Sequence, residues 1–407
     1  VTVTYGGASE TATVSGSGTW TMTMCDDESC SPSAGLSAVT ANVDDVAGNS
    51  ATEADVNAWY DAVAPTTTLS SVDISADTGS SASDFITKTA AQTVTATLSA
   101  ALASGETLQV SVDGGSNWAN DDHATGDGTA LSTAATLSGS SSLQIRIIDT
   151  AGNAGSVSST NYVLDTTAPT STSATIAVSG SGNANDGDVV TLTLDPSEDV
   201  QTPTCTWTDG SGAMEDTSVT YGTTGDDSHT AAVTVDNADQ DGAVGFSCTY
   251  SDTAGNAIAA AITSATSGSV TIDNTHPTST SAVLAVDGSG DGSNGDDITL
   301  TLNPSEDVGT PTCTFTSGNA AMANTVAYTT TGDDSHVATI EVADGDTNGA
   351  VAFSCTYSDT AGNAIATAIT AASSGAVTID NTHPTASAVT IAVSGTGNGN
   401  DADVVTL

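Results

Sequence analysis

The chain has 407 residues and a formal net charge of −47, because 49 Asp and Glu residues face one lysine, Lys88, and one arginine, Arg146. Binding to nucleic acid or to an anionic membrane surface depends on Lys and Arg, so this balance excludes both kinds of partner. No apolar run approaches 18 residues, so the sequence predicts no membrane-spanning segment.

The acidic residues are unevenly divided between the two types, with 41 Asp and only 8 Glu. An acidic surface that serves solubility in high salt should draw on both types, although salt adaptation stays open as an alternative. Asp set beside Gly, Asn and Ser is typical of turns and of loops that bind cations through oxygen atoms. The composition therefore favours ordered loops over a merely charged surface.

A repeated motif divides the chain into modules. The string Asp-x-Ala-Gly-Asn starts at Asp45, Asp149, Asp252 and Asp359, and each copy is followed by Asp-x-x-x-Pro. The prolines, Pro65, Pro169, Pro277 and Pro384, recur at intervals of 104, 108 and 107 residues, and each interval is about the length of one domain. The sequence predicts three full modules at 65–168, 169–276 and 277–383, flanked by truncated modules at 1–64 and 384–407, as in an excerpt from a longer polypeptide.

Within each module, short β-branched runs alternate with polar residues and are separated by clusters of Gly, Asn, Asp and Ser. In the module 169–276 the predicted strands are 173–179, 189–194, 204–208, 217–222, 229–235, 244–251 and 268–273. Helix signals are nearly absent. Seven short strands in about 105 residues are typical of an immunoglobulin-like β-sandwich, so the predicted fold class is all-β, with such sandwiches in an elongated tandem array.

Paired cysteines predict disulfides and an oxidising, extracellular setting. Cys205 and Cys248 recur in the next module as Cys313 and Cys355, which indicates one bond per module between the third and sixth strands. Zinc is excluded, since no module offers four Cys or His ligands at suitable spacing. Trp207 shares a strand face with Cys205, as Phe246 and Tyr250 do with Cys248, so these aromatic side chains should lie in the core. Cys25 and Cys30 are expected to form a bridged hairpin tip.

Several motifs resemble those of the bacterial-type Ig-like repeats of giant secreted or cell-surface adhesins. They are DVAGN at 45–49, DTAGN at 149–153, 252–256 and 359–363, DAVAP at 61–65, DTTAP at 165–169, and DNTHP at 273–277 and 380–384. DTGSSASDFIT at 77–87, DGGSNW at 113–118, and PSEDV at 196–200 and 304–308 add to the resemblance, which covers nearly the whole chain. DNTHP departs from the commoner DTTAP through His276 and His383. Members of this family are usually elongated stalks whose linkers are stiffened by calcium.

The resemblance implies calcium ligands at the Asp of each Asp-x-Ala-Gly-Asn turn and at the Asp before each boundary proline. Calcium takes six to eight oxygen ligands, and the turn can add an amide oxygen from its Asn. The candidate ligands are Asp45, Asn49, Asp61, Asp149, Asn153, Asp165, Asp252, Asn256, Asp273, Asp359, Asn363 and Asp380. The first turn of the adjoining module, with Asp77 and Asp84, Asp186 and Asp188, or Asp296 and Asp297, could complete the shell. Alternatively, these motifs are plain turns in which Asp and Asn bond the backbone.

No nucleophile elbow, P-loop or dinucleotide-binding fingerprint occurs, so no enzyme activity is expected. His229 and His336 in the repeated GDDSH segment could bind a metal, but a turn that starts a strand is the favoured interpretation. We expect an extracellular stalk whose partners are adjacent modules or other copies of the chain, and a surface receptor or glycan. The alternative is a subunit of an extracellular filament or surface hair. Trp118 and the Thr-rich strands also permit carbohydrate or ice binding.

Overall fold

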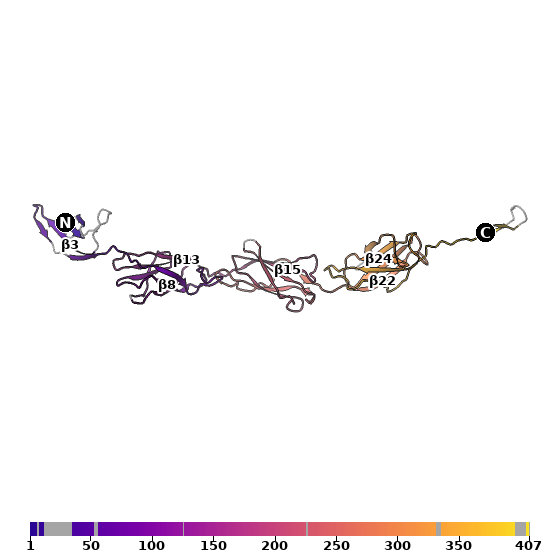
Figure 1. Ribbon diagram of the computed structural model, residues 1–407, viewed down its shortest axis with the longest axis horizontal. Coiled ribbons are helices and arrows are strands. Elements are labelled where there is room, and N and C mark those ends of the chain that lie inside the picture. The colour runs from indigo at the N-terminus through magenta and orange to yellow at the C-terminus, as the bar shows by residue number, and fades with distance from the viewer. Residues whose placement is uncertain are drawn as a thin grey trace. The chain divides into compact units, whose positions relative to one another are not determined.

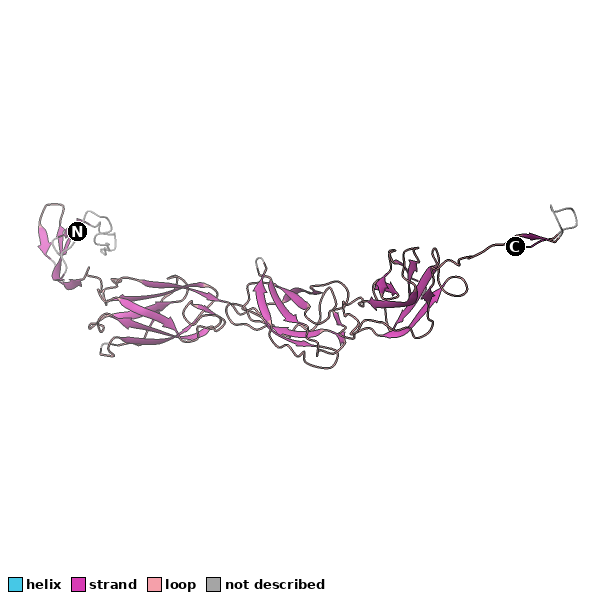
Figure 2. Ribbon diagram, turned by 45° about the vertical axis from the view of Figure 1, so that its right-hand side comes forward, coloured by secondary structure: helices cyan, strands magenta, loops and turns pink. Residues whose placement is uncertain are grey.

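The computed structural model describes residues 1–5, 8–11, 35–52, 56–124, 126–224, 227–330, 335–394 and 404–406. In this part of the chain the regular structure consists of β-strands, without a helix, and so without one able to cross a membrane (Figures 1 and 2). The all-β prediction is confirmed. The chain divides into two compact units. One comprises residues 1–171, 196–203 and 249–261, and the other residues 172–195, 204–248 and 262–407.

The first unit begins with one sheet of strand order β2-β1-β3-β4, to which β5 adds on β3. These strands are β1 (Thr2–Tyr5), β2 (Ala8–Thr11), β3 (Gly35–Asp44), β4 (Ser50–Thr52) and β5 (Val56–Tyr60). Cys25 and Cys30 lie outside the described residues, so the predicted bridge between them stays a prediction.

The second module, 65–168, is a sandwich of two sheets with strand orders β11-β8-β6 and β10-β9-β12-β13-β7. In β8 every second residue is buried, which is the pattern of a strand with one face on a core. The core includes Val94, Leu108, Ile145 and Ile147. The strands are β6 (Leu69–Ile74), β7 (Ile86–Thr87), β8 (Ala91–Leu98), β9 (Thr107–Ser111), β10 (Ala119–Asn120), β11 (Ala130–Thr136), β12 (Ser141–Ile148) and β13 (Ser158–Leu164).

All seven strands predicted for the module 169–276 are present. They are β14 (Ser171–Val178), β15 (Val189–Pro196), β16 (Thr204–Thr208), β17 (Thr220–Thr223), β18 (His229–Thr234), β20 (Gly245–Thr249) and β21 (Thr271–Ile272), with β19 (Gly242–Ala243) added. The strands form sheets of order β14-β15-β18-β17, β16-β20 and β19-β21. His229 is the buried first residue of β18, so a strand begins where the GDDSH segment was expected to start one.

The module 277–383 has the sheets β22-β23-β27-β26 and β25-β24-β28-β29. With β25 set aside as an additional edge strand and the others labelled in chain order, these are the A-B-E-D and C-F-G sheets of an immunoglobulin-like sandwich. Its strands are β22 (Ser279–Val286), β23 (Asp297–Pro304), β24 (Thr312–Ser317), β25 (Ala320–Ala321), β26 (Ala327–Thr330), β27 (His336–Glu341), β28 (Gly349–Thr356) and β29 (Thr378–Ile379). A last short pair, β30 (Ala392–Val393) and β31 (Val405–Thr406), follows.

Two of the predicted disulfides are present, Cys205–Cys248 and Cys313–Cys355. Each joins the third strand to the sixth, which are neighbours in one sheet, so the predicted connection is confirmed. Trp207, Phe246 and Tyr250 are buried as the strand parity predicts, and the rings of Trp207 and Phe246 lie 6.0 Å apart.

A buried aspartate braces the tip of the third module. The Asp209 carboxylate accepts hydrogen bonds from the backbone N–H groups of Gln240, Ser211 and Gly212, each at 2.8 Å. These bonds, with that from Gln240 the strongest, lower the pKa of Asp209 from 3.8 to about 2. In the fourth module the residue four positions after the third-strand cysteine, Cys313, is Ser317. The carboxylate that Asp209 supplies is therefore missing at the equivalent position of the fourth module.

Replacing Asp209 by Asn should therefore destabilise the third module by about 1–2 kcal/mol at neutral pH, since charged acceptors are lost. Because the folded pKa is depressed, the stability that Asp209 contributes is complete above pH 3.8 and disappears as the pH falls toward 2. The melting temperatures of wild type and Asp209→Asn should thus converge over this range. Calorimetry of the full chain checks this, with the Ser317 module as internal control. A gap that persists undiminished at pH 2 would contradict it.

Candidate metal centre

Each Asp-x-Ala-Gly-Asn string forms a turn closed by its own side chains. In the third module the carboxylate of Asp252 accepts the backbone N–H of Asn256 at 2.8 Å and its side-chain amide at 2.7 Å. Gly255 has a φ of 93°, a left-handed conformation that favours glycine. The turns at Asp45, Asp149 and Asp359 are built in the same way. The bonds expected of a plain turn are therefore present.

In three of the four turns the asparagine also holds the linker that precedes its module. The side-chain amide of Asn153 donates to the Asp61 carbonyl at 2.8 Å, that of Asn256 to the Asp165 carbonyl at 2.9 Å, and that of Asn363 to the Asp273 carbonyl at 2.7 Å. The turn follows the sixth strand, and the last strand leads back to the opposite pole. Each of these three turns therefore lies against the preceding linker, a point that the sequence had left open.

This arrangement brings three carboxylates together at two of the joints. Asp165 of the linker, Glu198 of the first PSEDV segment and Asp252 of the turn offer oxygen atoms that all lie within 4.8 Å of one another. Asp273, Glu306 and Asp359 repeat the cluster at the next joint. The whole of the first triad belongs to one compact unit and the whole of the second to the other.

One carboxylate of each triad is buried, and the other two are half-buried. Asp252 is 1% exposed and Asp359 is 7% exposed. Burial raises the pKa of Glu198, and the charges of Asp165 and Asp252 raise it further. Burial, Asp273, Asp359 and Asp241 raise the pKa of Glu306 in the same way. Buried like charges are costly unless protons or a cation compensate them, and donors consisting only of oxygen fit a hard cation such as calcium.

The glutamates were not among the ligands predicted from sequence. Their signal was the recurrence of PSEDV, in which Glu, the rarer acid in this chain, occupies the same place in two modules. The first-turn aspartates considered for this role do not belong to the triads. Asp77 instead accepts the N–H of Phe85, and Asp188 and Asp296 accept bonds within their own turns.

The joint before Pro65 lacks the third carboxylate. Ser99, Ser197 and Ser305 each accept the N–H of a threonine that lies one to three residues after the boundary proline, and each donates its own N–H to the carbonyl of that threonine, which makes them equivalent positions. The next residue is Glu198 or Glu306 in two modules but Ala100 in the second module. Asp61 and Asp149 are therefore without a glutamate partner at that position.

The other predicted ligands lie in turns. Asp45 is exposed, and its pKa is lowered chiefly by the side chain of Asn49. Asp380 accepts the N–H of Thr382 at 2.9 Å and the side-chain amide of Asn348 at 3.1 Å.

Two basic side chains hold backbone at the same joints. The Lys88 ammonium donates to the carbonyl of Gly255, within the third module's turn, at 2.5 Å. The ring Nδ1 of His276 lies 2.8 Å from the Ala364 carbonyl, one residue after the fourth module's turn. The histidine of the first DNTHP linker therefore contacts the chain directly after the turn of the fourth module.

No family model and no curated protein matches the chain. Among solved structures it is similar to a tetra-tandem repeat from the extending region of a large adhesion protein (20% identity, 94% of this chain and 91% of that one, TM-score 0.28). It is also similar to an I-band fragment of titin (8%, 78% and 97%, 0.31) and to the N-terminal eight Ig domains of Down syndrome cell adhesion molecule (13%, 85% and 46%, 0.23). The strand orders themselves identify the chain as a tandem array of immunoglobulin-like β-sandwich modules.

Proposed function

We propose that the chain is an extracellular stalk segment of a repetitive surface adhesin, in which calcium ions stiffen joints between modules. The observation that carries this proposal is the carboxylate triad, built twice from a linker Asp, a PSEDV Glu and a turn Asp. A calcium ion held by all three would tie the linker to the module that follows it. Asp165, Glu198 and Asp252 would hold one ion, and Asp273, Glu306 and Asp359 another.

The rest of the molecule supports a structural role. Repeated sandwiches with buried disulfides suit an extracellular protein that must keep its fold without partners to protect it. The turn asparagines fix each linker by hydrogen bonds even before a cation is considered, and the boundary prolines restrict its backbone. Calcium would add charge compensation that these hydrogen bonds do not supply.

Small-angle scattering of the full chain tests the proposal. With calcium, the maximum dimension should be longer and more sharply defined than with a chelator, because flexible joints sample bent arrangements. The control is the double variant Glu198→Gln/Glu306→Gln in the same calcium buffer, since a chain of charge −47 also responds to general screening. The variant should resemble the chelated wild type. Identical profiles for all three samples would remove calcium from the account.

A further inference from the structure

The third and fourth modules have a strand that is not found among the described residues of the second module. In the third and fourth modules the strand that pairs with the second strand of the sandwich, β18 or β27, is itself covered at its outer edge by β17 or β26. In the second module the corresponding strand is β11, and the sheet ends there, in the order β11-β8-β6. Residues 112–129 connect β9 to β11, and the equivalent segments of the third and fourth modules, 209–228 and 318–335, are of similar length. Within the described residues of this segment the second module forms only β10, which pairs with β9, so no strand covers β11.

The outer edge of β11 is therefore open. The N–H of Leu98 bonds the Thr129 carbonyl and the N–H of Leu137 bonds the Ala90 carbonyl, so the odd-numbered residues between them face β8. The N–H and carbonyl groups of Ser132, Ala134 and Thr136 point the other way, and within the described residues no hydrogen bond to them is found. This edge has none of the usual protection, since β11 contains no Lys, no Pro and no charge.

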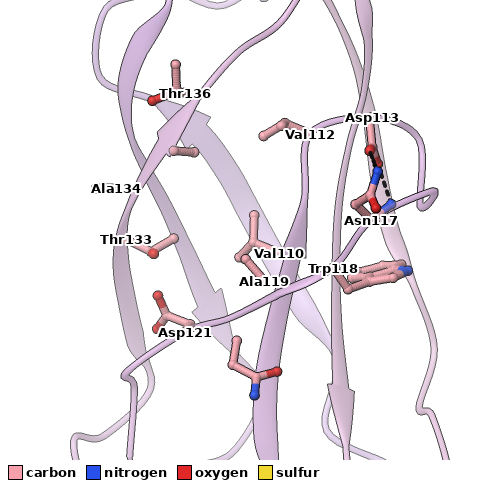
Figure 3. Close-up of a pocket in the computed structure, with 12 residues that line it drawn as sticks. Val110, Val112, Asp113, Asn117, Trp118, Ala119, Asp121, Thr133, Ala134 and Thr136 are labelled. Carbon is pink, nitrogen blue, oxygen red and sulfur yellow. Dashed lines mark hydrogen bonds between the residues drawn. The ribbon is translucent and has the colours of Figure 1, made fainter.

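A groove lies directly beside this edge. It has a volume of about 320 Å³ and opens between β11 and the β9–β10 pair (Figure 3). Thr133, Ala134, Thr136 and Asp121 line one side, while Val110, Val112 and Ala119 line the other. The volume is at the lower end of the range of ligand pockets. The ring of Trp118 points away from the groove, and the guanidinium of Arg146 lies 4.0 Å from the ring centre.

The neighbouring modules show what fills this space. Tyr221 of β17 is paired with Ala231, and its hydroxyl accepts the N–H of Cys205 in the opposite sheet at 2.9 Å. Tyr328 of β26 makes the same contact with Cys313 at 2.8 Å and packs against the core. Each of these tyrosines thus bridges the two sheets at the open side of the sandwich.

Equivalent positions place the missing tyrosine over the groove. Ile145, Cys248 and Cys355 each lie four residues before the Asp of the turn, and Ile145 is paired with Val110 as Cys355 is with Cys313. Val110 therefore stands at the position of Cys205. In the other sheet, Thr133 of β11 is paired with Val94 of β8, and Ala231 of β18 is paired with Leu192 of β15. Thr133 therefore corresponds to Ala231, the residue that is paired with Tyr221. Val110 and Thr133 thus occupy the positions that contact the tyrosine in the other two modules, and both line the groove.

We propose that the open edge of β11 binds an extended segment of a partner protein, which adds as a strand and places a tyrosine in the groove. Strand addition to a free edge, with side chains seated in adjacent pockets, is a common way of binding peptides. The groove is bordered by Asp113 and Asp121, and no Lys or Arg lines it. The segment should therefore carry Lys or Arg beside its tyrosine. Pairing with a second copy of this chain is disfavoured, because both copies carry a net charge of −47.

A synthetic peptide with the sequence of the fourth module's own covering strand tests this inference. The probe contains residues 325–330 (TVAYTT), has one lysine added at each end, and carries a fluorescein label. Titration with the full chain should give saturable anisotropy with one site per chain. Replacing the tyrosine of the peptide by alanine should weaken binding at least about tenfold, because a buried aromatic anchor is lost.

Two variants localise the site. Ala119→Trp fills the groove from β10 and leaves the residues of β11 unchanged, and Ala134→Pro removes an outward N–H at an edge, where proline is tolerated. Both should weaken binding at least about tenfold. Ser159→Trp, at an exposed position on β13, should bind as the wild type does, and cooperative melting verifies that each variant is folded. If Ala134→Pro does not fold, Ala119→Trp decides. Equal binding by all variants, more than one site, or peptide-independent dimerisation abolished by these variants would overturn the proposal.

Discussion

The double variant Cys205→Ala/Cys248→Ala should unfold its module about 15–25 °C below the wild type. The disulfide closes a loop of 43 residues, and the chain-entropy model gives about 3–4 kcal/mol for a loop of that length. In a domain of this size each kcal/mol corresponds to about 4–8 °C in the melting temperature. The effect is large because both cysteines are buried in a module with a small core, where alanine also removes packing.

The second module supplies a matched control for this experiment. At the same two positions it has Val110 and Ile145, which are paired across β9 and β12 and are both buried. Cys205→Val/Cys248→Ile should therefore recover about 1–3 kcal/mol relative to the alanine variant, since it restores apolar burial without a covalent link. Scanning calorimetry of the full chain under non-reducing conditions measures this, and the Cys313–Cys355 module serves as the internal reference. An alanine variant that melts with the wild type would show that the bond does not restrict the unfolded chain.

The sequence predicted the strands and disulfides of the third and fourth modules because both depend on local information. Alternation along 204–208 and 244–251 determines which side chains face the core, and that face contains both cysteines. Because the same cysteine pair recurs in two homologous modules, its spacing indicated a disulfide rather than a chance arrangement. Strand boundaries followed from Gly and Asp clusters that cannot continue a sheet.

The site was only partly predictable because it combines three distant segments. Asp165 and Asp252 were named from their motifs, but their pairing depends on the pole to which the last strand returns, and strand direction does not follow from residue types. Glu198 belongs to a connection between the second and third strands, and nothing in its spacing ties it to either aspartate. The open edge of β11 had no signal in segment length, because residues 112–129 between β9 and β11 are about as many as those that contain β17 or β26 in the other two modules.

Removing calcium should lower the stability of the joints that contain a triad, and the glutamate should decide which joints respond. At about 100 times the dissociation constant, a bound ion stabilises the folded state by about 2.7 kcal/mol. Glu198→Gln keeps the size of the side chain but removes one of three carboxylates, so the third module should lose most of this calcium-dependent increment. Glu306→Gln should do the same for the fourth module. Calorimetry with calcium and with a chelator measures both.

The joint before Pro65 provides the natural contrast, because Ala100 replaces the glutamate there. Its module should show little calcium dependence, and Ala100→Glu should create it, provided that Asp61 and Asp149 supply the other two carboxylates.

Glu215→Gln, at an exposed position outside the triads, controls for the loss of one charge. In the absence of calcium, Glu198→Gln should be as stable as the wild type or more so, since burial and two like charges disfavour the ionised glutamate. If Glu198→Gln and Glu215→Gln respond alike to calcium, the ion acts through general screening, and the triads are not its binding sites.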